Sequence, residues 1–336
     1  MGTGRLDLAF AEGAPEGRLL VIGAKAGDDL SMLAPARTTI VQPQFADHRA
    51  LGARGFHMAT EAAGPADAAL VVLPRAKALA RARIADAASH LPEGADLWID
   101  GQRTDGVESI LRDLRALTEI HDLHSKAHGK IFRVRTGPWL PADWTGQDSY
   151  PAPGFRAPPG AFSADGVDPA SAALAAALPS KMPTWVVDLG AGWGWLSARV
   201  LAKPGVEVLH LIEADHAAVE AARANVTDPR ARFHWADARD VALPDPVNGV
   251  VMNPPFHEGR AADPSLGRAF IATAARLLTQ AGTLWMVANR HLPYEATLSE
   301  HFARVTETGG DARFKIIEAT GARRDARSRS GRKVRA

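Results

Sequence analysis

The sequence predicts an α/β protein of two tandem domains, each with a mainly parallel sheet flanked by helices. Short β-branched or apolar runs alternate with Ala- and Leu-rich runs of helical period, a pattern typical of parallel sheets covered on both faces. The length of 336 residues is about twice that of a usual domain. A proline-rich stretch separates two halves whose strands and helices follow a similar order. Together these observations favour two domains of one class.

Strands in the first half are expected where short apolar runs occur, at Leu19–Ile22, Thr38–Val41, Ala69–Leu73 and Asp96–Ile99. Helices are expected where apolar residues recur at helical spacing, at Arg75–His90 and Asp105–Leu117. The first of these helices is basic, and its cations either contact phosphates or form a solvated face. They are Arg75, Lys77, Arg81 and Arg83.

Six prolines mark a linker between the halves, since helices and sheet interiors tolerate proline poorly. They are Pro138, Pro141, Pro151, Pro153, Pro158 and Pro159. We therefore expect a first domain over residues 1–140, a linker over 141–160 and a second domain over 161–322. The remaining residues, 323–336, are rich in arginine and are expected to be a disordered tail.

The second half repeats the alternation of the first. Its strands are expected at Trp185–Leu189, Glu207–Ile212, Arg232–Trp235, Gly249–Met252 and Thr283–Ala288, and its helices at Trp195–Ala202, His216–Asn225 and Leu266–Leu278. The two halves also align as diverged copies of one plan. The aligned segments are Leu19–Gly27 with Val186–Gly194, Leu70–Pro74 with Val250–Pro254, and the closing segments Gly129–Arg133 and Ala312–Ile316.

A glycine-rich turn in the second half is typical of a ligand site. The strand that ends near Asp188 leads into Gly190-Ala-Gly192-Trp-Gly194 and then into a helix. Glycine allows a tight turn and a close approach of the backbone to a ligand. Glu213 ends the next strand, where a carboxylate can accept hydrogen bonds from ribose hydroxyls. NAD enzymes share these features, so the turn indicates a nucleotide-like cofactor without choosing among them.

Two further acids follow the glycine turn. Asp215 is expected to cap the helix that begins beside it. Asp237 follows the strand predicted at Arg232–Trp235, and it either accepts a hydrogen bond from an adenine amino group or is a solvated loop acid.

The segment Asn253-Pro-Pro-Phe256 indicates the chemistry. It follows a predicted strand at the carboxyl edge of the sheet, where ligands of such folds bind. The Asn253 side-chain oxygen and the Pro254 carbonyl can each accept a hydrogen bond from a planar amino group, and the prolines hold these oxygens rigidly. Two acceptors on its hydrogens favour a pyramidal nitrogen whose lone pair can attack a methyl carbon. Phe256 offers an aromatic face to a base, worth roughly 1–3 kcal/mol.

On these residues the second half resembles the class I S-adenosylmethionine-dependent methyltransferases. It most resembles the bacterial 16S ribosomal RNA guanine-N2 methyltransferases, which carry a degenerate N-terminal copy. The resemblance implies two tandem Rossmann-like domains, each with a mainly parallel seven-stranded sheet. The segments that carry it are Gly160–Ser171, Val186–Ser197, Val250–Gly259 and Val287–Tyr294.

The resemblance also implies the roles of individual residues. Asp188, Gly190 and Gly192 would line the methionine part of S-adenosylmethionine, which leaves as S-adenosylhomocysteine. The segment that folds over the cofactor would include Phe162 and Asp168. The remaining implied contacts are Glu213 with the ribose, Asp237 with the adenine, and Asn253, Pro254 and Phe256 with the target guanine. Two features depart from the family pattern, namely the bulky Trp193 and Trp195 around the turn and the arginine-rich tail.

The first half lacks the groups that this chemistry needs. In the alignment Val21 replaces Asp188, Lys25 replaces Gly192, Gln42 replaces Glu213 and Leu73 replaces Asn253. The Lys25 side chain would enter the cofactor space. We therefore expect the first copy to be a scaffold or a substrate platform.

Composition excludes several classes of site. The chain has no cysteine, so disulfides, thiolate metal sites and cysteine nucleophiles are absent. Its formal net charge of +1 places any RNA contact on a local patch. Its apolar runs are far shorter than the roughly 20 residues that span a bilayer, and a soluble cytoplasmic protein is expected. His121, His124 and His128 have no carboxylate cluster beside them, so no metal is expected.

The sequence thus predicts methyl transfer from S-adenosylmethionine to a guanine N2 in ribosomal RNA or the small ribosomal subunit. Adenine N6 and the side-chain amide of a protein glutamine are also planar amino nitrogens, and they stay open as alternative targets. A non-enzymatic RNA-binding factor and an NAD-linked oxidoreductase are the alternatives from other classes.

Overall fold

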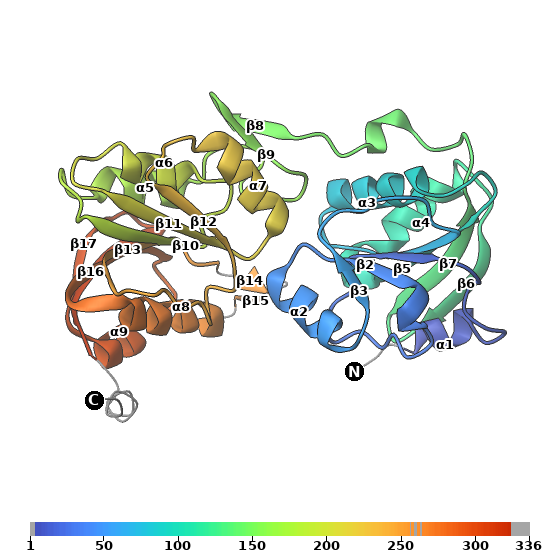
Figure 1. Cartoon of the computed structure of the whole chain (residues 1–336), viewed down its shortest axis with the longest axis horizontal. Coiled ribbons are helices and arrows are strands. Elements are labelled where there is room, and N and C mark those ends of the chain that lie inside the picture. Colours follow the sequence, from blue (N-terminus) through green and yellow to red (C-terminus); the bar gives the residue numbers. More distant parts are fainter. Residues whose placement is uncertain (1–3, 256, 259–260, 263, 324–336) are drawn as a thin grey trace, which may run out of the picture. The chain divides into compact units, whose positions relative to one another are not determined.

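Two seven-stranded, mainly parallel sheets form the body of the chain, and helices cover both faces of each (Figure 1). The computed structural model describes residues 4–255, 257–258, 261–262 and 264–323. Two compact units result: the first comprises Met1–Ser149, Ala157–Ala164 and Asp215–Ala217, and the second Tyr150–Arg156, Asp165–Ala214 and Ala218–Ala336. The predicted fold class is confirmed.

The first unit has the strand order β3-β2-β1-β4-β5-β7-β6, in which β7 is antiparallel to both neighbours. Its strands are β1 (Leu19–Ile22), β2 (Thr38–Val41), β3 (His57–Ala59), β4 (Ala68–Val72), β5 (Asp96–Gln102), β6 (His121–Lys126) and β7 (Gly129–Arg135). Its helices are α1 (Arg5–Ala9), α2 (Phe45–Ala53), α3 (Lys77–Ser89) and α4 (Val107–Arg115), with 3-10 turns at Pro35–Arg37 and Arg103–Asp105.

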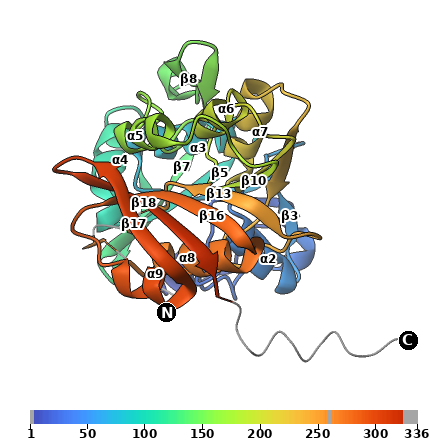
Figure 2. The same cartoon turned by 90° about the vertical axis from the view of Figure 1, so that its left-hand side faces the viewer.

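The second unit has the equivalent order β12-β11-β10-β13-β16-β18-β17. Its strands are β10 (Trp185–Leu189), β11 (Val208–Glu213), β12 (Ala231–Trp235), β13 (Val247–Met252), β16 (Leu278–Asn289), β17 (Phe302–Gly310) and β18 (Phe314–Ala322). Figure 2 shows β18 between β16 and β17. The helices are α5 (Pro169–Ala177), α6 (Trp195–Leu201), α7 (His216–Asn225), α8 (Pro264–Leu277) and α9 (Glu295–His301), and a short pair, β14 (His257–Glu258) and β15 (Ala261–Ala262), precedes α8.

Burial explains the central strands. Successive side chains of a strand point to opposite faces, so a strand covered on both faces must be apolar throughout. In β10, Val186 packs in the core with α5 and α6, whereas Val187 packs in the core with α8 and α9. In β1, Leu20 packs with α3 and α4, and Val21 packs with α1 and α2.

The strand registers of the two units coincide and confirm the predicted duplication. Val21 pairs with Ile40 in the first unit, as Asp188 pairs with Leu211 in the second. Gln42 lies two residues after Ile40, and Glu213 lies two residues after Leu211. Gln42 therefore stands where the second unit has Glu213, as predicted.

One aligned pair was wrong by a residue. Val21 pairs with Leu70, and Asp188 pairs with Val251, so the residue two positions further on is Val72 in the first unit and Asn253 in the second. Valine rather than Leu73 therefore stands where the second unit has its asparagine. Adjacent apolar residues offered no signal that could fix the register from sequence.

The proline-rich stretch contains more regular structure than a linker requires. A 3-10 turn spans Ala142–Trp144, and β8 (Ser149–Ala152) and β9 (Phe155–Ala157) form a hairpin. The Asn225 amide, at the end of α7, closes two hydrogen bonds with the backbone of Arg156, of 2.9 and 2.8 Å. This hairpin is therefore attached to the second unit next to the glycine turn.

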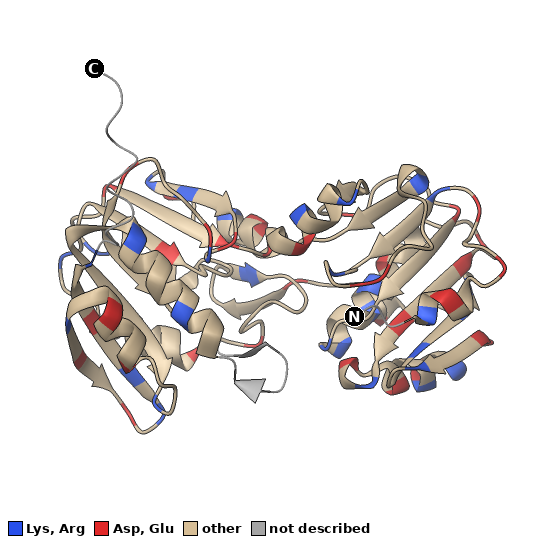
Figure 3. Cartoon of the chain, turned by 90° about the horizontal axis from the view of Figure 1, so that it is seen from below, with Lys and Arg blue, Asp and Glu red and all other residues tan. Residues whose placement is uncertain are grey.

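Acidic and basic residues are interspersed over both units (Figure 3), in keeping with the net charge of +1. In the part of the chain that the structure describes, every helix is too short or too polar to cross a bilayer. The expected tail lies outside the described residues, apart from Arg323.

Candidate active site

Three predicted site residues lie at the carboxyl ends of adjacent parallel strands in the second unit. Asp188 pairs with Leu211 of β11 and with Val251 of β13. Glu213 and Asn253 each follow their strand's paired residue by two positions, so all three reach one edge of the sheet. Open α/β sheets bind their ligands at this edge.

The glycine turn leaves one face of its backbone open. Gly190, Gly192 and Gly194 have φ values of 76°, 54° and 89°, which glycine adopts without strain. A Cβ on Gly190 would lie 3.2 Å from Phe270, and one on Gly194 would lie 2.9 Å from Val226. A Cβ on Gly192 would meet no described atom within 4 Å, so this glycine faces open space where a ligand can approach.

The two tryptophans of the turn pack on protein. Trp193 is buried, and its ring lies edge-on to Phe155 of the β8–β9 hairpin at 5.7 Å between centroids. Its carbonyl accepts a 2.8 Å hydrogen bond from Asn225. Trp195 begins α6, and the guanidinium of Arg199 lies 4.9 Å from its ring. The bulk that departs from the family pattern therefore holds the turn in place.

Asp188 is a buried carboxyl with one oxygen unused. Its Oδ2 accepts a 2.6 Å hydrogen bond from Ser197 Oγ, and its Oδ1 has no partner among the described residues. Burial raises the pKa of Asp188 to about 7, and the nearby negative charge of Glu213 acts in the same direction. An unpaired oxygen of this kind fits a cationic or hydrogen-bond-donating ligand.

Glu213 connects the end of β11 to the glycine turn. Its two oxygens accept hydrogen bonds from the backbone N–H groups of Gly192 and Ala214, both at 2.8 Å. A carboxylate only accepts hydrogen bonds, and ribose hydroxyls are donors that it can bind. Asp215 caps α7 through a 3.0 Å bond from the Ala217 N–H, as predicted.

Asp237 forms an ion pair that the sequence did not reveal. The guanidinium of Arg239 binds it through contacts of 2.9 and 2.5 Å, and the Arg239 N–H donates to it at 2.8 Å. Burial would raise the pKa of Asp237, but these hydrogen bonds outweigh it and hold the pKa below its ordinary value. Asp237 is therefore an ionised acceptor beside β12.

The Asn253 side chain is held by two partners on one side only. Its Nδ2 donates to Asp168 Oδ2 and to Ser171 Oγ, both at 2.8 Å. Asp168 Oδ2 also accepts the Ser171 N–H at 2.7 Å and so caps the start of α5. Asn253 Oδ1 is buried and has no partner among the described residues.

This arrangement fixes the orientation of the amide. A carboxylate is only an acceptor, so the NH2 group of Asn253 must face Asp168 and the carbonyl oxygen must face the other way. The site therefore presents a buried, rigid and unsatisfied acceptor.

Three further residues were predicted to contact the ligands, and the structure describes two of them. Pro254 is buried, and Phe162 is 63% exposed. Phe256 lies outside the described residues, so its stacking role stays a prediction. Sequence reasoning missed Ser171 and Ser197, although Asp168-Pro-Ala-Ser171 has the pattern of a helix N-terminus, with an N-cap followed by proline.

Arg83 lies against the turn of the first unit that corresponds to the glycine turn. A Cβ on Gly23, the counterpart of Gly190, would lie 2.1 Å from the guanidinium of Arg83. That guanidinium donates to the Val72 carbonyl at 3.2 Å, and Gln42 donates to the Ala24 carbonyl at 2.6 Å. Sequence reasoning did not single out Arg83 for this position, and Lys25, which was expected to enter the cofactor space, is exposed.

The basic helix of the first unit serves mostly internal contacts. Lys77 and Arg81 form ion pairs with Asp113 at 2.9 and 2.7 Å, and Arg83 binds Val72. Among the four cations, Arg75 is exposed and forms no ion pair with a described residue. In the part of the chain that the structure describes, no three histidines or carboxylates gather as they would around a metal ion.

A family model matches each of the two units. The model of the methyltransferase small domain matches residues 153–318, and the model of its N-terminal domain matches residues 14–142. Among solved structures, the 16S rRNA N2 methyltransferase of T. thermophilus, in complex with AdoMet and guanosine, superposes with a TM-score of 0.77 at 23% identity. That match covers 94% of this chain and 91% of the other, and it supports the two-unit fold.

Sequence identity to curated relatives shows the family to which the chain belongs. The chain is 30% identical to the ribosomal RNA small subunit methyltransferase C of Klebsiella pneumoniae subsp. pneumoniae, over 78% of each chain. It is 27% identical to that of Alteromonas mediterranea, over 75% of this chain and 72% of the relative. A shorter match, 37% identical, covers 42% of this chain and 39% of the ribosomal RNA large subunit methyltransferase G of Aeromonas salmonicida. The chain therefore belongs to the ribosomal RNA small subunit methyltransferase C family.

Proposed function

We propose that the second unit transfers a methyl group from S-adenosylmethionine to the exocyclic N2 of a guanine in small-subunit ribosomal RNA. The observation that carries this proposal is the amide of Asn253, whose NH2 is engaged by Asp168 and Ser171 while its buried Oδ1 has no partner among the described residues. An unsatisfied buried acceptor fits a ligand that supplies a donor, and a guanine amino group does. Family membership agrees with this substrate and with a cytoplasmic location beside the ribosome.

The residues at the carboxyl edge suit the cofactor. Asp188 Oδ1 is free to pair with the methionine ammonium, and the open face of Gly192 admits the methionine chain. Glu213 is a carboxylate at the end of β11 and suits the ribose hydroxyls, and Asp237 is an ionised acceptor for the adenine amino group. When bound, S-adenosylmethionine supplies an electrophilic methyl group and leaves as S-adenosylhomocysteine. Phe162 and Asp168 belong to the segment that we place over the cofactor.

The chain's own contribution is to position the target nitrogen. The lone pair of an amino group on a purine is delocalised into the ring, which makes the nitrogen a poor nucleophile. Acceptance of its two hydrogens by Asn253 Oδ1 and the Pro254 carbonyl favours a pyramidal nitrogen and directs the lone pair at the methyl carbon. Effects of this kind are orientation and charge stabilisation. The nitrogen gains a positive charge as it takes the methyl group and then releases one proton to solvent, so a strong general base is unnecessary. The guanine must be unpaired to enter the site.

The substrate can be tested with purified protein. Wild-type protein and Asn253→Ala are incubated with radiolabelled S-adenosylmethionine and either small- or large-subunit RNA from cells that lack the gene. We expect N2-methylguanosine in small-subunit RNA with the wild type and none with the variant. Transfer only to large-subunit RNA would instead match the chain's 37% identity to the large-subunit relative. Label in adenine N6, or no label in either RNA, would contradict the proposal.

A further inference from the structure

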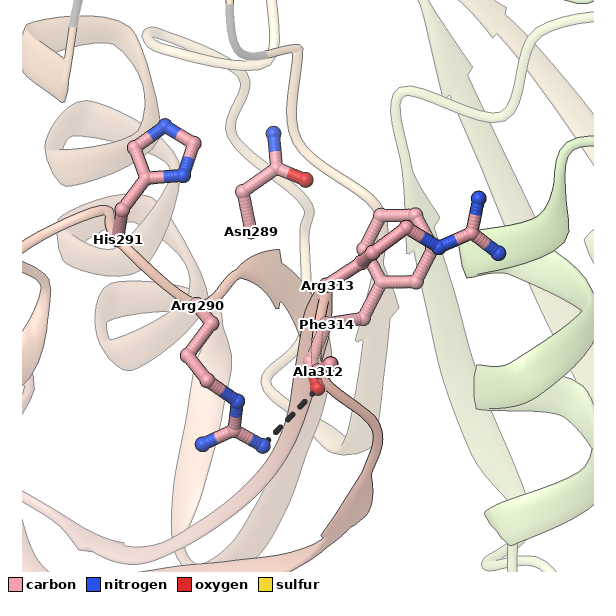
Figure 4. A pocket seen from close by; sticks show the side chains of 6 residues that line it. All are labelled: Asn289, Arg290, His291, Ala312, Arg313 and Phe314. Atoms are coloured by element: carbon pink, nitrogen blue, oxygen red, sulfur yellow. Dashed lines mark hydrogen bonds between the residues drawn. The ribbon is translucent and has the colours of Figure 1, made fainter.

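We propose that a hollow at the end of β16 binds the phosphate of a nucleotide that neighbours the target guanine, an inference that rests on the proposed function. The hollow has a volume of about 490 Å³, which is large enough for a nucleotide. It is lined by Asn289, Arg290, His291, Ala312, Arg313 and Phe314 (Figure 4).

Its position places it beside the candidate active site. Met252 of β13 pairs with Met286 of the parallel strand β16, so Asn253 lies level with Val287 and Asn289 extends two residues further. With about 3.3 Å per residue and about 4.8 Å between strands, the Cα atoms of Asn253 and Asn289 lie roughly 8 Å apart. A strand of RNA whose guanine reaches Asn253 therefore passes this hollow with an adjacent nucleotide.

Arg290 lines the hollow, but its guanidinium is already bound to other groups of the protein. Its guanidinium binds Glu307 at 2.9 Å and the carbonyls of Asp311 and Phe314 at 2.8 and 3.2 Å. In Figure 4 this side chain extends away from those of Asn289 and His291. We therefore assign Arg290 to the wall of the hollow.

Arg313 is the cation that remains available. Its guanidinium lies 5.3 Å from the centroid of the Phe314 ring, and it makes no ion pair or side-chain hydrogen bond with a described residue. Both Arg313 and His291 are exposed. A guanidinium held against an aromatic ring keeps its N–H groups free for bidentate binding to phosphate. Asn289 and His291 can add N–H donors from the opposite side of the hollow.

The two acids near the hollow, Glu307 and Asp311, each have a partner in the structure. Glu307 is neutralised by Arg290. Asp311 Oδ1 accepts the backbone N–H groups of Arg313 and Phe314, at 2.7 and 2.8 Å, and these bonds keep its pKa below the ordinary value. Asp311 thus closes the turn before β18 and stays ionised, and the charges of Arg313 and Arg290 add to this effect. Arg313 nevertheless forms no ion pair with it, so its guanidinium N–H groups remain for a phosphate.

The walls are also rigid. The Arg290 N–H donates to the Arg313 carbonyl at 2.8 Å and joins the two sides of the hollow. The buried Lys315 donates to the Leu292 carbonyl at 2.9 Å and pairs with Glu295, which fixes the segment after β16. A preformed site loses little entropy when it binds a ligand.

The proposal is tested with the full-length chain, small-subunit RNA and a range of salt concentrations. Filter binding gives the slope of log affinity against log salt, and kinetics give KM and kcat with S-adenosylmethionine saturating. The variants are Arg313→Ala, Arg313→Lys, which keeps the charge, and Arg304→Ala, a matched control at an exposed arginine of β17 outside the hollow. Calorimetry with S-adenosylmethionine checks that the cofactor site is intact.

Loss of one phosphate contact lowers the salt slope by about 0.7 for single-stranded nucleic acid. We expect this change in Arg313→Ala together with a KM about tenfold higher, an unchanged kcat and unchanged cofactor affinity. The slope should return in Arg313→Lys and stay at the wild-type value in Arg304→Ala.

An unchanged slope in Arg313→Ala, or an equal loss in Arg304→Ala, would overturn the phosphate site. That outcome would leave the proposed function standing if the wild type methylates guanine. A wild type that methylates no guanine would refute the proposed function, and the slope from filter binding would still decide whether Arg313 contacts an RNA phosphate.

Discussion

Single residues carry the chemistry of this chain, and Asn253 is the most informative of them. The sequence predicted its acceptor oxygen because the Asn-Pro-Pro-Phe segment follows a parallel strand. It could not predict the partners of the NH2 group, because Asp168 and Ser171 are 85 and 82 residues away along the chain. Only the fold brings the N-cap of α5 to the end of β13.

The contact with Asn253 gives Asp168 a role that can be separated from cofactor binding. Asp168→Asn replaces a pure acceptor by an amide and removes a charge-assisted hydrogen bond, worth about 1.5–3 kcal/mol. If Asp168 positions Asn253, kcat should fall roughly 10- to 100-fold while the Kd for S-adenosylmethionine stays within a few-fold. Steady-state kinetics and calorimetry check this, with Ser171→Ala as a milder control that removes a neutral partner. A large rise in Kd with kcat retained would assign Asp168 to the cofactor alone.

Asp188 should make cofactor binding dependent on pH. Its pKa is about 7 in the folded chain because it is buried, so the carboxyl becomes neutral as the pH falls through 7 and no longer balances a cation. We expect the affinity for S-adenosylmethionine to fall by up to about tenfold per unit below pH 7 and to level off above it. Calorimetry from pH 5.5 to 8.5 measures this. Asp188→Asn should bind weakly at every pH, and a flat wild-type profile would show that Asp188 does not face the cation.

At the scale of elements, burial determined what the sequence could predict. The buried strands β1, β2 and β10 and the helix α7 were predicted at the bounds that the structure shows. The helix α2 was missed because Leu51 alone among its residues is buried, which leaves no apolar periodicity. β17 was missed for a similar reason, since most of its side chains are exposed.

Gly267 of α8 packs against the segment that follows β16, and this packing explains why a glycine stands there. No sequence pattern had indicated it. The Tyr294 side chain is fully buried, and a Cβ on Gly267 would lie 2.1 Å from its hydroxyl oxygen. Gly267→Ala should therefore cost about 1–3 kcal/mol of the free energy of unfolding, as overpacked cores do. Urea denaturation measures this cost. Gly27→Ala is the matched control, because its Cβ would meet no described atom within 4 Å, and an equal loss in both variants would argue against the packing account.

The whole molecule is a duplication in which one copy has lost its site. The matching strand order and the two replaced acids were predicted correctly from the sequence. The contact of Arg83 with Gly23 was not, because it comes from a side chain of α3 that an alignment of strands does not include. The two copies keep apolar strands because both need a core, whereas only one needs the polar residues.

The number of cofactor molecules bound per chain tests whether only the second unit has a site. Because Val21, Lys25, Gln42 and Val72 replace the residues proposed to bind the cofactor in the second unit, the first unit should not bind S-adenosylmethionine. Calorimetry should give one site per chain, and Glu213→Ala, in the second unit, should abolish measurable binding. Two sites, or one site that survives in Glu213→Ala, would place a cofactor in the first unit.

The central claim is that Asn253 presents a guanine N2 of small-subunit RNA to the methyl group. The most direct measurement is N2-methylguanosine in small-subunit RNA from cells that lack the gene and carry a plasmid copy of either the wild type or Asn253→Ala. We predict that the nucleoside at one position is lost without the gene, restored by the wild type and still absent with the variant, although the variant binds S-adenosylmethionine normally. Unchanged N2-methylguanosine in the deletion, or full restoration by Asn253→Ala, would contradict the account.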